Sequence, residues 1–358
     1  MEKPNKPNER VLFRSVEVPT QPIAEELSLW GQERTGIIMP GPINHFAEVD
    51  EAKVVFGQSD RKPVTWQEHL DHLKDQQARL ERMNKSSDYA RVDITSQLPI
   101  GVVATGDWHL YARGTDYATW EKHMKLIKDT PNVFMIPHGN TIDNFIFPSG
   151  MFEQMGNPSE QIEMVKSFAN DFKDKFLAVV GSRCHEGWTD QRTDVNIYEQ
   201  MFTDTIDQGT PFFGNGGVVE INLNGIAYRW GAIHKSRYHS SLNPTNLNRQ
   251  LHDLRWPVDI LSGAHHHVAQ LLQGVKYEPP FEKDVIFIRT GTYKGSDNYS
   301  EGEGFGKGQL ASPMVILDPA RKHMIAFYYI EDGVNYLNMQ RELAQFKLAQ
   351  NAQEGTGK

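Results

Sequence analysis

The sequence has one cysteine, no long apolar run and no excess of basic residues, and each of these absences excludes a class of protein. A single cysteine, Cys184, in 358 residues rules out an intramolecular disulfide and suits a reducing compartment. No window approaches the ~18 apolar residues of a membrane span, and the polar N-terminus lacks the apolar core of a signal peptide. A net charge of −9 gives no global basic field for nucleic acid. We therefore expect a soluble, cytoplasmic protein with no membrane partner.

The N-terminal part of the chain, residues 1–97, differs in character from the rest. It opens with a polar, proline-rich stretch and then shows apolar residues every three or four positions over 65–83, which predicts a helix. Thr65 and Glu68 fit a capping box at the start of this helix. We expect the extension to pack on the main domain or on a partner chain, where it could mediate a homo-oligomer. A substrate lid and a DNA-contacting element are the alternatives.

Residues 98–333 alternate short apolar runs with amphipathic stretches and are expected to form one domain. The first half reads as strand, helix, strand, helix, strand, at 99–105, 117–128, 132–136, 159–173 and 176–180. This order predicts a layered sheet with mostly parallel strands. In the second half, Asn224-Gly225 separates two apolar runs and predicts a β-hairpin. The remaining segment, 334–358, is predicted to be a helix followed by a polar tail.

Five polar clusters follow apolar stretches of this domain. They are Gly106-Asp107-Trp108-His109, Gly139-Asn140-Thr141-Ile142-Asp143-Asn144, Gly181-Ser182-Arg183-Cys184-His185-Glu186, Ala232-Ile233-His234 and Gly263-Ala264-His265-His266-His267. Carboxylate, imidazole and amide groups delivered at strand ends are what a hydrolase with two metal ions needs. Asp107 and His109 stand two residues apart, so on an extended segment both can reach one ion. A carboxylate oxygen with an imidazole nitrogen suits manganese, iron or zinc.

The second and third clusters supply further candidate groups, and two of them are unusual. Asn140 is a candidate metal ligand at the place where a carboxylate would best bridge two ions, and its amide, with one neutral oxygen, would bridge poorly. Cys184 is either a thiolate ligand for a soft metal or a small buried residue. His185 could protonate a leaving alkoxide, assisted by the adjacent carboxylate of Glu186.

The last two clusters consist of histidines behind strand ends. Three consecutive imidazoles are rare in a core, because each needs hydrogen-bond partners. In an extended segment His265 and His267 share a side, while His266 points away. We interpret His234, His265 and His267 as metal ligands.

The order of these clusters resembles the motifs of the calcineurin-like metallophosphoesterase superfamily over about residues 98–330. The resemblance implies a four-layer α/β/β/α sandwich, here preceded by the N-terminal extension. It also implies one or two divalent metal ions per chain, with Mn²⁺ expected first and iron, zinc or magnesium as alternatives. The implied ligands are Asp107, His109 and His267 for the first metal and His234 and His265 for the second. His185 would contact the phosphate and assist the leaving group.

The chain departs from the superfamily pattern at three positions. Asn140 replaces the bridging aspartate, Cys184 stands at the place of an asparagine ligand, and Ala264 is an extra residue before His265. The sequence predicts a metal-dependent phosphoesterase in which water activated by metal attacks a phosphodiester, in the manner of a nuclease. Its substrate would be a nucleic acid or a nucleotide, with Arg183, Arg237 and Tyr238 as candidate substrate-binding residues. A weakened or inactive binding or structural protein on the same fold is the alternative, because of Asn140.

Overall fold

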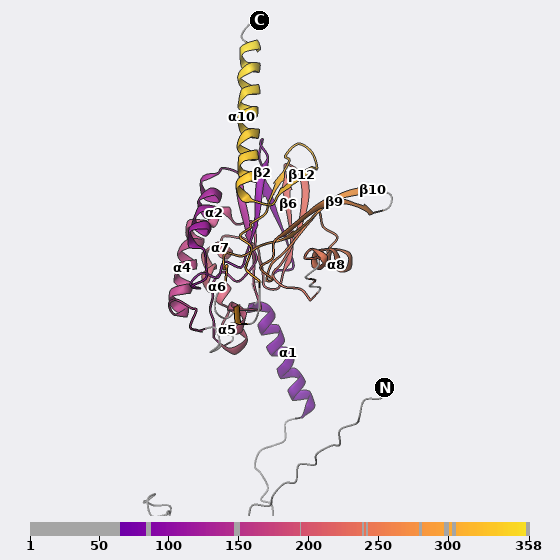
Figure 1. Ribbon diagram of the computed structural model, residues 1–358. Helices are drawn as coiled ribbons and strands as arrows, with labels where there is room; N and C mark the ends of the chain where they lie inside the picture. Colours follow the sequence, from indigo (N-terminus) through magenta and orange to yellow (C-terminus); the bar gives the residue numbers. More distant parts are fainter. Residues whose placement is uncertain are drawn as a thin grey trace, which may run out of the picture. The chain divides into compact units, whose positions relative to one another are not determined.

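The computed structural model describes residues 65–83, 87–146, 151–193, 195–237, 240, 243–278, 281–296, 301–302 and 306–355. By its internal contacts the chain divides into two units, Met1–Trp66 and Gln67–Lys358. The helices and strands described below belong to the second unit, apart from the first residue of α1. Figure 1 labels the helices and several of the strands.

Eight α-helices are described. They are α1 (Trp66–Met83), α2 (Tyr117–Asp129), α4 (Pro158–Asp171), α5 (Glu186–Thr193), α6 (Ile197–Met201), α7 (Thr203–Asp207), α8 (Asn246–Leu254) and α10 (Ile330–Gly355), with a 3₁₀ turn, η2, at Lys173–Lys175. Local signals explain where several of them begin. The Asp116 side chain accepts a hydrogen bond from the backbone of Thr119 at the start of α2, and Asn157 and Glu160 form a capping box at the start of α4.

The strands form two main sheets and a short pair. A six-stranded sheet has the order β1 (Tyr89–Ile94), β6 (Gly217–Leu223), β7 (Ile226–Ile233), β8 (Ile260–Gly263), β10 (Phe281–Arg289), β9 (Gln270–Glu278). A four-stranded sheet has the order β12 (Met324–Phe327), β11 (Met314–Leu317), β2 (Ile100–Thr105), β3 (Val133–Pro137). The pair β4 (Val179–Val180) and β5 (Phe212–Phe213) is joined to β3 by parallel bridges.

Three apolar clusters order these elements into layers. Val102, Ile136, Trp230 and Ile288 belong to a core whose buried residues come from both sheets. A second core joins β2 and β3 to α2, α4, α6 and α10, and a third joins α8 to β7, β8 and β10. Figure 1 shows α2 and α4 on one side of the sheets and α8 on the other. The α/β/β/α order predicted from the sequence is therefore confirmed.

Most predicted elements are present, with some changes at their ends. Asn224 and Gly225 both have positive φ, 51° and 89°, as a two-residue hairpin between β6 and β7 requires. β1 pairs in parallel with β6, so the sheet begins before residue 98. The C-terminal helix starts at Ile330, earlier than the predicted 334, and runs for 26 residues. The helix predicted at 65–83 forms as α1, and Trp66 on it is 69% exposed.

Candidate metal centre

Strand pairing brings the five polar clusters to one end of the two sheets. β2 and β3 run parallel with Thr105 opposite Pro137, so the segments that follow them leave the sheet side by side. The amide of Asp107 donates to the carbonyl of Gly139 at 3.0 Å, which ties the first cluster to the second. In the other sheet Ile233 lies opposite Gly263, and Ala264 donates its amide hydrogen to the carbonyl of His234.

The first group of potential ligands consists of Asp107, His109 and His267. The Nε2 atoms of the two histidines lie 3.1 Å apart. The Asp107 Oδ1 atom lies 3.9 Å from Nε2 of His109 and 3.7 Å from Nε2 of His267. One carboxylate oxygen and two imidazole nitrogens therefore converge on a single point, the arrangement that a divalent cation needs.

The second group consists of Cys184, His234 and His265, whose potential ligand atoms all lie within 4.8 Å of one another. The Nδ1 atom of His234 donates to the backbone carbonyl of His138 at 2.6 Å, which leaves Nε2 as the ligand atom. This Nε2 is buried and has no hydrogen-bond partner among the described residues. Burial lowers the pKa of His234 to about 3, so the ring is neutral, as a metal ligand must be.

Asn140 lies beside the first group of potential ligands, and its side-chain amide hydrogen-bonds to two residues, Asp107 and Ser182. Its Nδ2 atom donates to Asp107 Oδ1 at 3.0 Å, and its Oδ1 atom accepts a hydrogen bond from the Ser182 hydroxyl at 2.7 Å. The amide thus holds two neighbours in place, and its donor group faces Asp107, where a bridging carboxylate would present an oxygen. Gly139 has a φ of 75°, and a Cβ atom there would lie 2.8 Å from the Cβ of Ser182.

A third group of potential ligands, His109, Asp143 and His185, brings Asp143 and its partner Lys294 to the site. Asp143 accepts from Nδ1 of His109 at 3.1 Å, so it orients this ring with Nε2 toward the first group. The buried ammonium of Lys294 lies 3.1 Å from the same carboxylate oxygen. The Asp143 backbone carbonyl accepts a hydrogen bond from Nδ1 of His185. Asp143 stands three residues after Asn140, where it is expected to orient the loop or its neighbours.

His185 and Glu186, predicted to act together, have different surroundings. The His185 ring stacks on Trp188 at a centroid distance of 4.6 Å and meets the edge of His109 at the same distance. The Glu186 carboxylate accepts from the amide and hydroxyl of Thr141 and from the amide of Ile142. Burial raises the pKa of Glu186 to about 7. Its contacts fix the loop that carries Asn140.

Burial and backbone conformation both suit a bound cation. Burial raises the pKa of Asp107 to about 8, although hydrogen bonds from the backbone of His265 and from the Asn140 side chain act to lower it. A bound cation would favour the charged form of this carboxylate. Ten non-glycine residues in the described part of the chain have positive φ. Six of them are the site residues Asp107, His109, Asn140, His185, His265 and His267. Such conformations cost about 1–3 kcal/mol each and cluster at functional sites. The donor set therefore fits divalent metal ions.

The site reaches the surface at His267, whose side chain is 30% exposed. Arg183 and Arg237 are exposed, and the Arg183 guanidinium donates to the Asn215 side chain. Tyr238, also predicted to bind substrate, lies outside the described residues. Lys235 is exposed as well, and its charge acts on Cys184 and His265.

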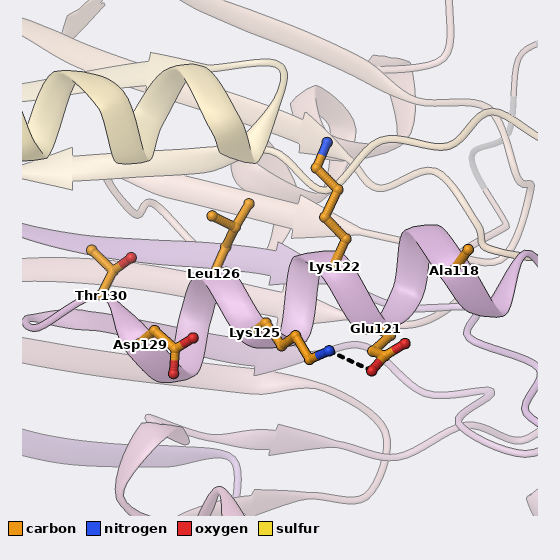
Figure 2. Close-up of a pocket in the computed structure, with 7 residues that line it drawn as sticks. All are labelled: Ala118, Glu121, Lys122, Lys125, Leu126, Asp129 and Thr130. Carbon is orange, nitrogen blue, oxygen red and sulfur yellow. Dashed lines mark hydrogen bonds and ion pairs between the residues drawn. The ribbon is translucent and has the colours of Figure 1, made fainter.

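A separate shallow pocket lies along α2. Figure 2 shows its lining residues, all on or just after this helix, with an ion pair between Lys125 and Glu121. None of the predicted site residues lines it. None of the helices in the described part of the chain has both the length and the apolar character needed to cross a membrane.

No model of a protein family matches the sequence, and no curated protein matches it. Among solved structures, the chain is similar to a conserved uncharacterized protein from Streptococcus pneumoniae described as a predicted phosphoesterase. That match has 11% identity and a TM-score of 0.31, and covers 65% of this chain and 91% of the other. It is also similar to the nuclease MPE of Pseudomonas putida, with 11% identity and a TM-score of 0.27, covering 63% and 87% of the two chains. Both TM-scores lie below 0.5, so the function proposed below rests on the residues of the site. In its layered α/β fold and in the order of its strand-end motifs, the chain resembles the calcineurin-like metallophosphoesterases.

Proposed function

We propose that this chain is a metal-dependent phosphoesterase that hydrolyses phosphodiesters. The observation that carries the proposal is the meeting of Asp107, His109 and His267 around one point, next to a second group of three potential ligands. Metal ions bound to these residues would polarise the phosphoryl oxygens and activate water for in-line attack. Mn²⁺ is our first expectation for the Asp107 group, because carboxylate and imidazole ligands suit this ion.

We propose that His185 assists departure of the leaving group. Its Nδ1 donates to the carbonyl of Asp143, which leaves Nε2 as the nitrogen that would give a proton to the departing oxygen. The ring is held by stacking on Trp188 and by the edge of Phe145, at centroid distances of 4.6 Å and 5.3 Å. A ring held by these two contacts loses little freedom when the substrate binds, which favours proton transfer in one orientation.

Positive charge beside the clusters suits an anionic substrate. Lys294 is buried beside Asp143, whereas Arg183, Lys235 and Arg237 are exposed. The three exposed cations could hold phosphoryl oxygens, although the net charge of the whole chain is −9. A local basic rim on an acidic protein fits a nucleotide or a single strand better than a long duplex, and we propose nucleic acid or nucleotide phosphodiesters as the substrate class.

A binding or structural protein on the same fold is the second candidate function. It is favoured by Asn140, whose amide hydrogen bond to Asp107 occupies the place where a carboxylate would join two ions. Such a protein would still bind a metal ion at the first group, but would turn over no phosphoester. The two candidates therefore differ in activity and agree in metal binding.

The test is an assay of bis(p-nitrophenyl) phosphate and of a labelled single-stranded oligonucleotide, using protein stripped by chelator and then supplied with Mn²⁺, Fe²⁺ or Zn²⁺. We expect no turnover without metal and turnover after reconstitution. His185→Asn should lower kcat by about 10²–10⁴-fold with metal content retained. The matched control is His72→Asn on α1, an exposed histidine. Absence of turnover with every metal would refute the enzyme and leave the binding protein.

A further inference from the structure

The two groups of ligands differ in one donor atom, and this difference bears on which metal each prefers. Asp107, His109 and His267 offer a carboxylate and two imidazoles, whereas Cys184, His234 and His265 offer a thiol and two imidazoles. Thiolate sulfur selects zinc over manganese and magnesium, while carboxylate oxygen accommodates the harder ions.

We propose that Cys184, His234 and His265 form a zinc-selective site in which the Cys184 thiolate is a ligand, next to a half-site of different metal preference. This inference rests on the metal centre proposed above, but it does not require turnover. On binding, the S–H bond of Cys184 is lost, its proton passes to solvent and the sulfur electron pair is donated to zinc.

The spacing of the ligand atoms agrees with this assignment. A tetrahedral zinc holds sulfur at about 2.3 Å and nitrogen at about 2.0–2.1 Å, so two such ligands lie roughly 3.6 Å apart. The Cys184 Sγ and His265 Nδ1 atoms are 3.8 Å apart. The thiol therefore approaches a zinc-ligand separation without any movement of the backbone.

A second observation, independent of the cysteine, comes from His234. This residue is 2% exposed, and its Nε2 atom has no hydrogen-bond partner in the described part of the chain. A buried polar atom without a partner costs about 1–3 kcal/mol. Its Nδ1 is tied to the His138 carbonyl, so the ring cannot turn without losing that bond. A cation among the three ligands would satisfy Nε2.

Asn140 allows the two half-sites to fill independently. A bridging carboxylate would join both ions through its two oxygens, and the affinity of each half would then depend on the other. The Asn140 amide instead binds Asp107 and Ser182. Each half-site is left to the chemistry of its own ligands. Three protein ligands on the zinc side leave a fourth position open, as in catalytic zinc sites.

The experiment is a Co²⁺ titration of the full-length chain after metal has been removed with chelator. Co²⁺ is a spectroscopic probe for zinc sites, and its sulfur ligands give a charge-transfer band in the near ultraviolet. The chain has one cysteine, so a thiolate band can come only from Cys184. We expect the band to grow until one Co²⁺ is bound at this site, to be abolished by one equivalent of Zn²⁺ and to persist when Mn²⁺ is added.

Two variants locate the band. Cys184→Ser should lose the thiolate band, and the zinc affinity of that site should fall by at least about 100-fold. Even the loss of a residue that only hydrogen-bonds to a metal ligand typically lowers metal affinity by about 10–100-fold. The matched control, His267→Gln, alters the other half-site and should keep the band. The decisive measurement uses the unaltered chain, so a variant that fails to fold does not obscure the answer.

The outcomes separate this inference from the proposed function. Cobalt bound without a thiolate band would overturn the zinc-selective site and leave the metal centre in place. No bound cobalt at all would overturn both the zinc site and the proposed metal centre. A thiolate band with no phosphodiesterase activity under any metal would support the zinc site and refute only the enzyme.

Discussion

Asp143 connects the metal centre to the stability of the fold, and its replacement gives a sharp prediction. Its carboxylate is fully buried and lies 3.1 Å from both the Lys294 ammonium and His109 Nδ1. In Asp143→Asn, Lys294 loses the carboxylate that faces its buried charge, and His109 loses the acceptor that orients its ring. Removing one partner of a buried ion pair costs about 3–5 kcal/mol. Because asparagine keeps one oxygen acceptor, we expect about 3 kcal/mol, and a 10–100-fold loss of metal affinity at the Asp107 group.

The assay is urea unfolding of the metal-free chain, followed by metal titration of the folded variant. The matched control is Asp171→Asn, whose partner Lys128 lies at a similar 3.0 Å but in an ion pair exposed to solvent. That change should cost about 0–1 kcal/mol. The double variant Asp143→Asn/Lys294→Met removes the buried charge as well, and the two changes should couple by about 1–3 kcal/mol. Equal costs for Asp143→Asn and Asp171→Asn would refute the reasoning.

Three further predictions concern the loop of Asn140 and a buried histidine. Asn140→Asp should lower the melting temperature of the metal-free chain, because the new carboxylate would lie beside the buried carboxylate of Asp107. With metal bound, the variant should gain both stability and turnover. A variant that gains neither would contradict this prediction. Gly139→Ala should destabilise the fold by about 1–2 kcal/mol or more in urea unfolding, since φ is 75° and the new Cβ would meet Ser182; an unchanged midpoint would contradict it. Burial lowers the pKa of His123 below its ordinary value of 6.5, so as the pH falls this histidine takes up a proton more readily in the unfolded chain than in the folded one. The free energy of unfolding should therefore fall as the pH drops below about 6.5. His123→Gln should remove that part of the decline.

The sequence was sufficient for the alternation of strands and helices in the first half and for the placement of polar clusters after its strands. Clusters placed after parallel strands converge because the strands end at the same edge, and Asp107 and Asn140 illustrate this directly. The Asn224-Gly225 hairpin was predictable because both positions need positive φ. The pairing of β1 with β6 was not, since it joins segments more than a hundred residues apart.

The partners of the site were harder to predict than its ligands. Lys294 reaches Asp143 because β10 runs parallel to β8 and delivers the following segment to the same end of the sheet. No local pattern marks this lysine, since its role depends on pairing between distant strands. Glu186 was expected to assist His185. In the structure α5 begins at Glu186, and its carboxylate accepts a hydrogen bond from the amide of Thr141.

The central claim is that these strand-end residues form a metal centre. Anomalous diffraction from crystals grown with both Mn²⁺ and Zn²⁺, recorded on either side of each absorption edge, tests it most directly. We expect a manganese peak among Asp107, His109 and His267, and a zinc peak between Cys184, His234 and His265. If neither group of ligands shows an anomalous peak, the metal centre is contradicted.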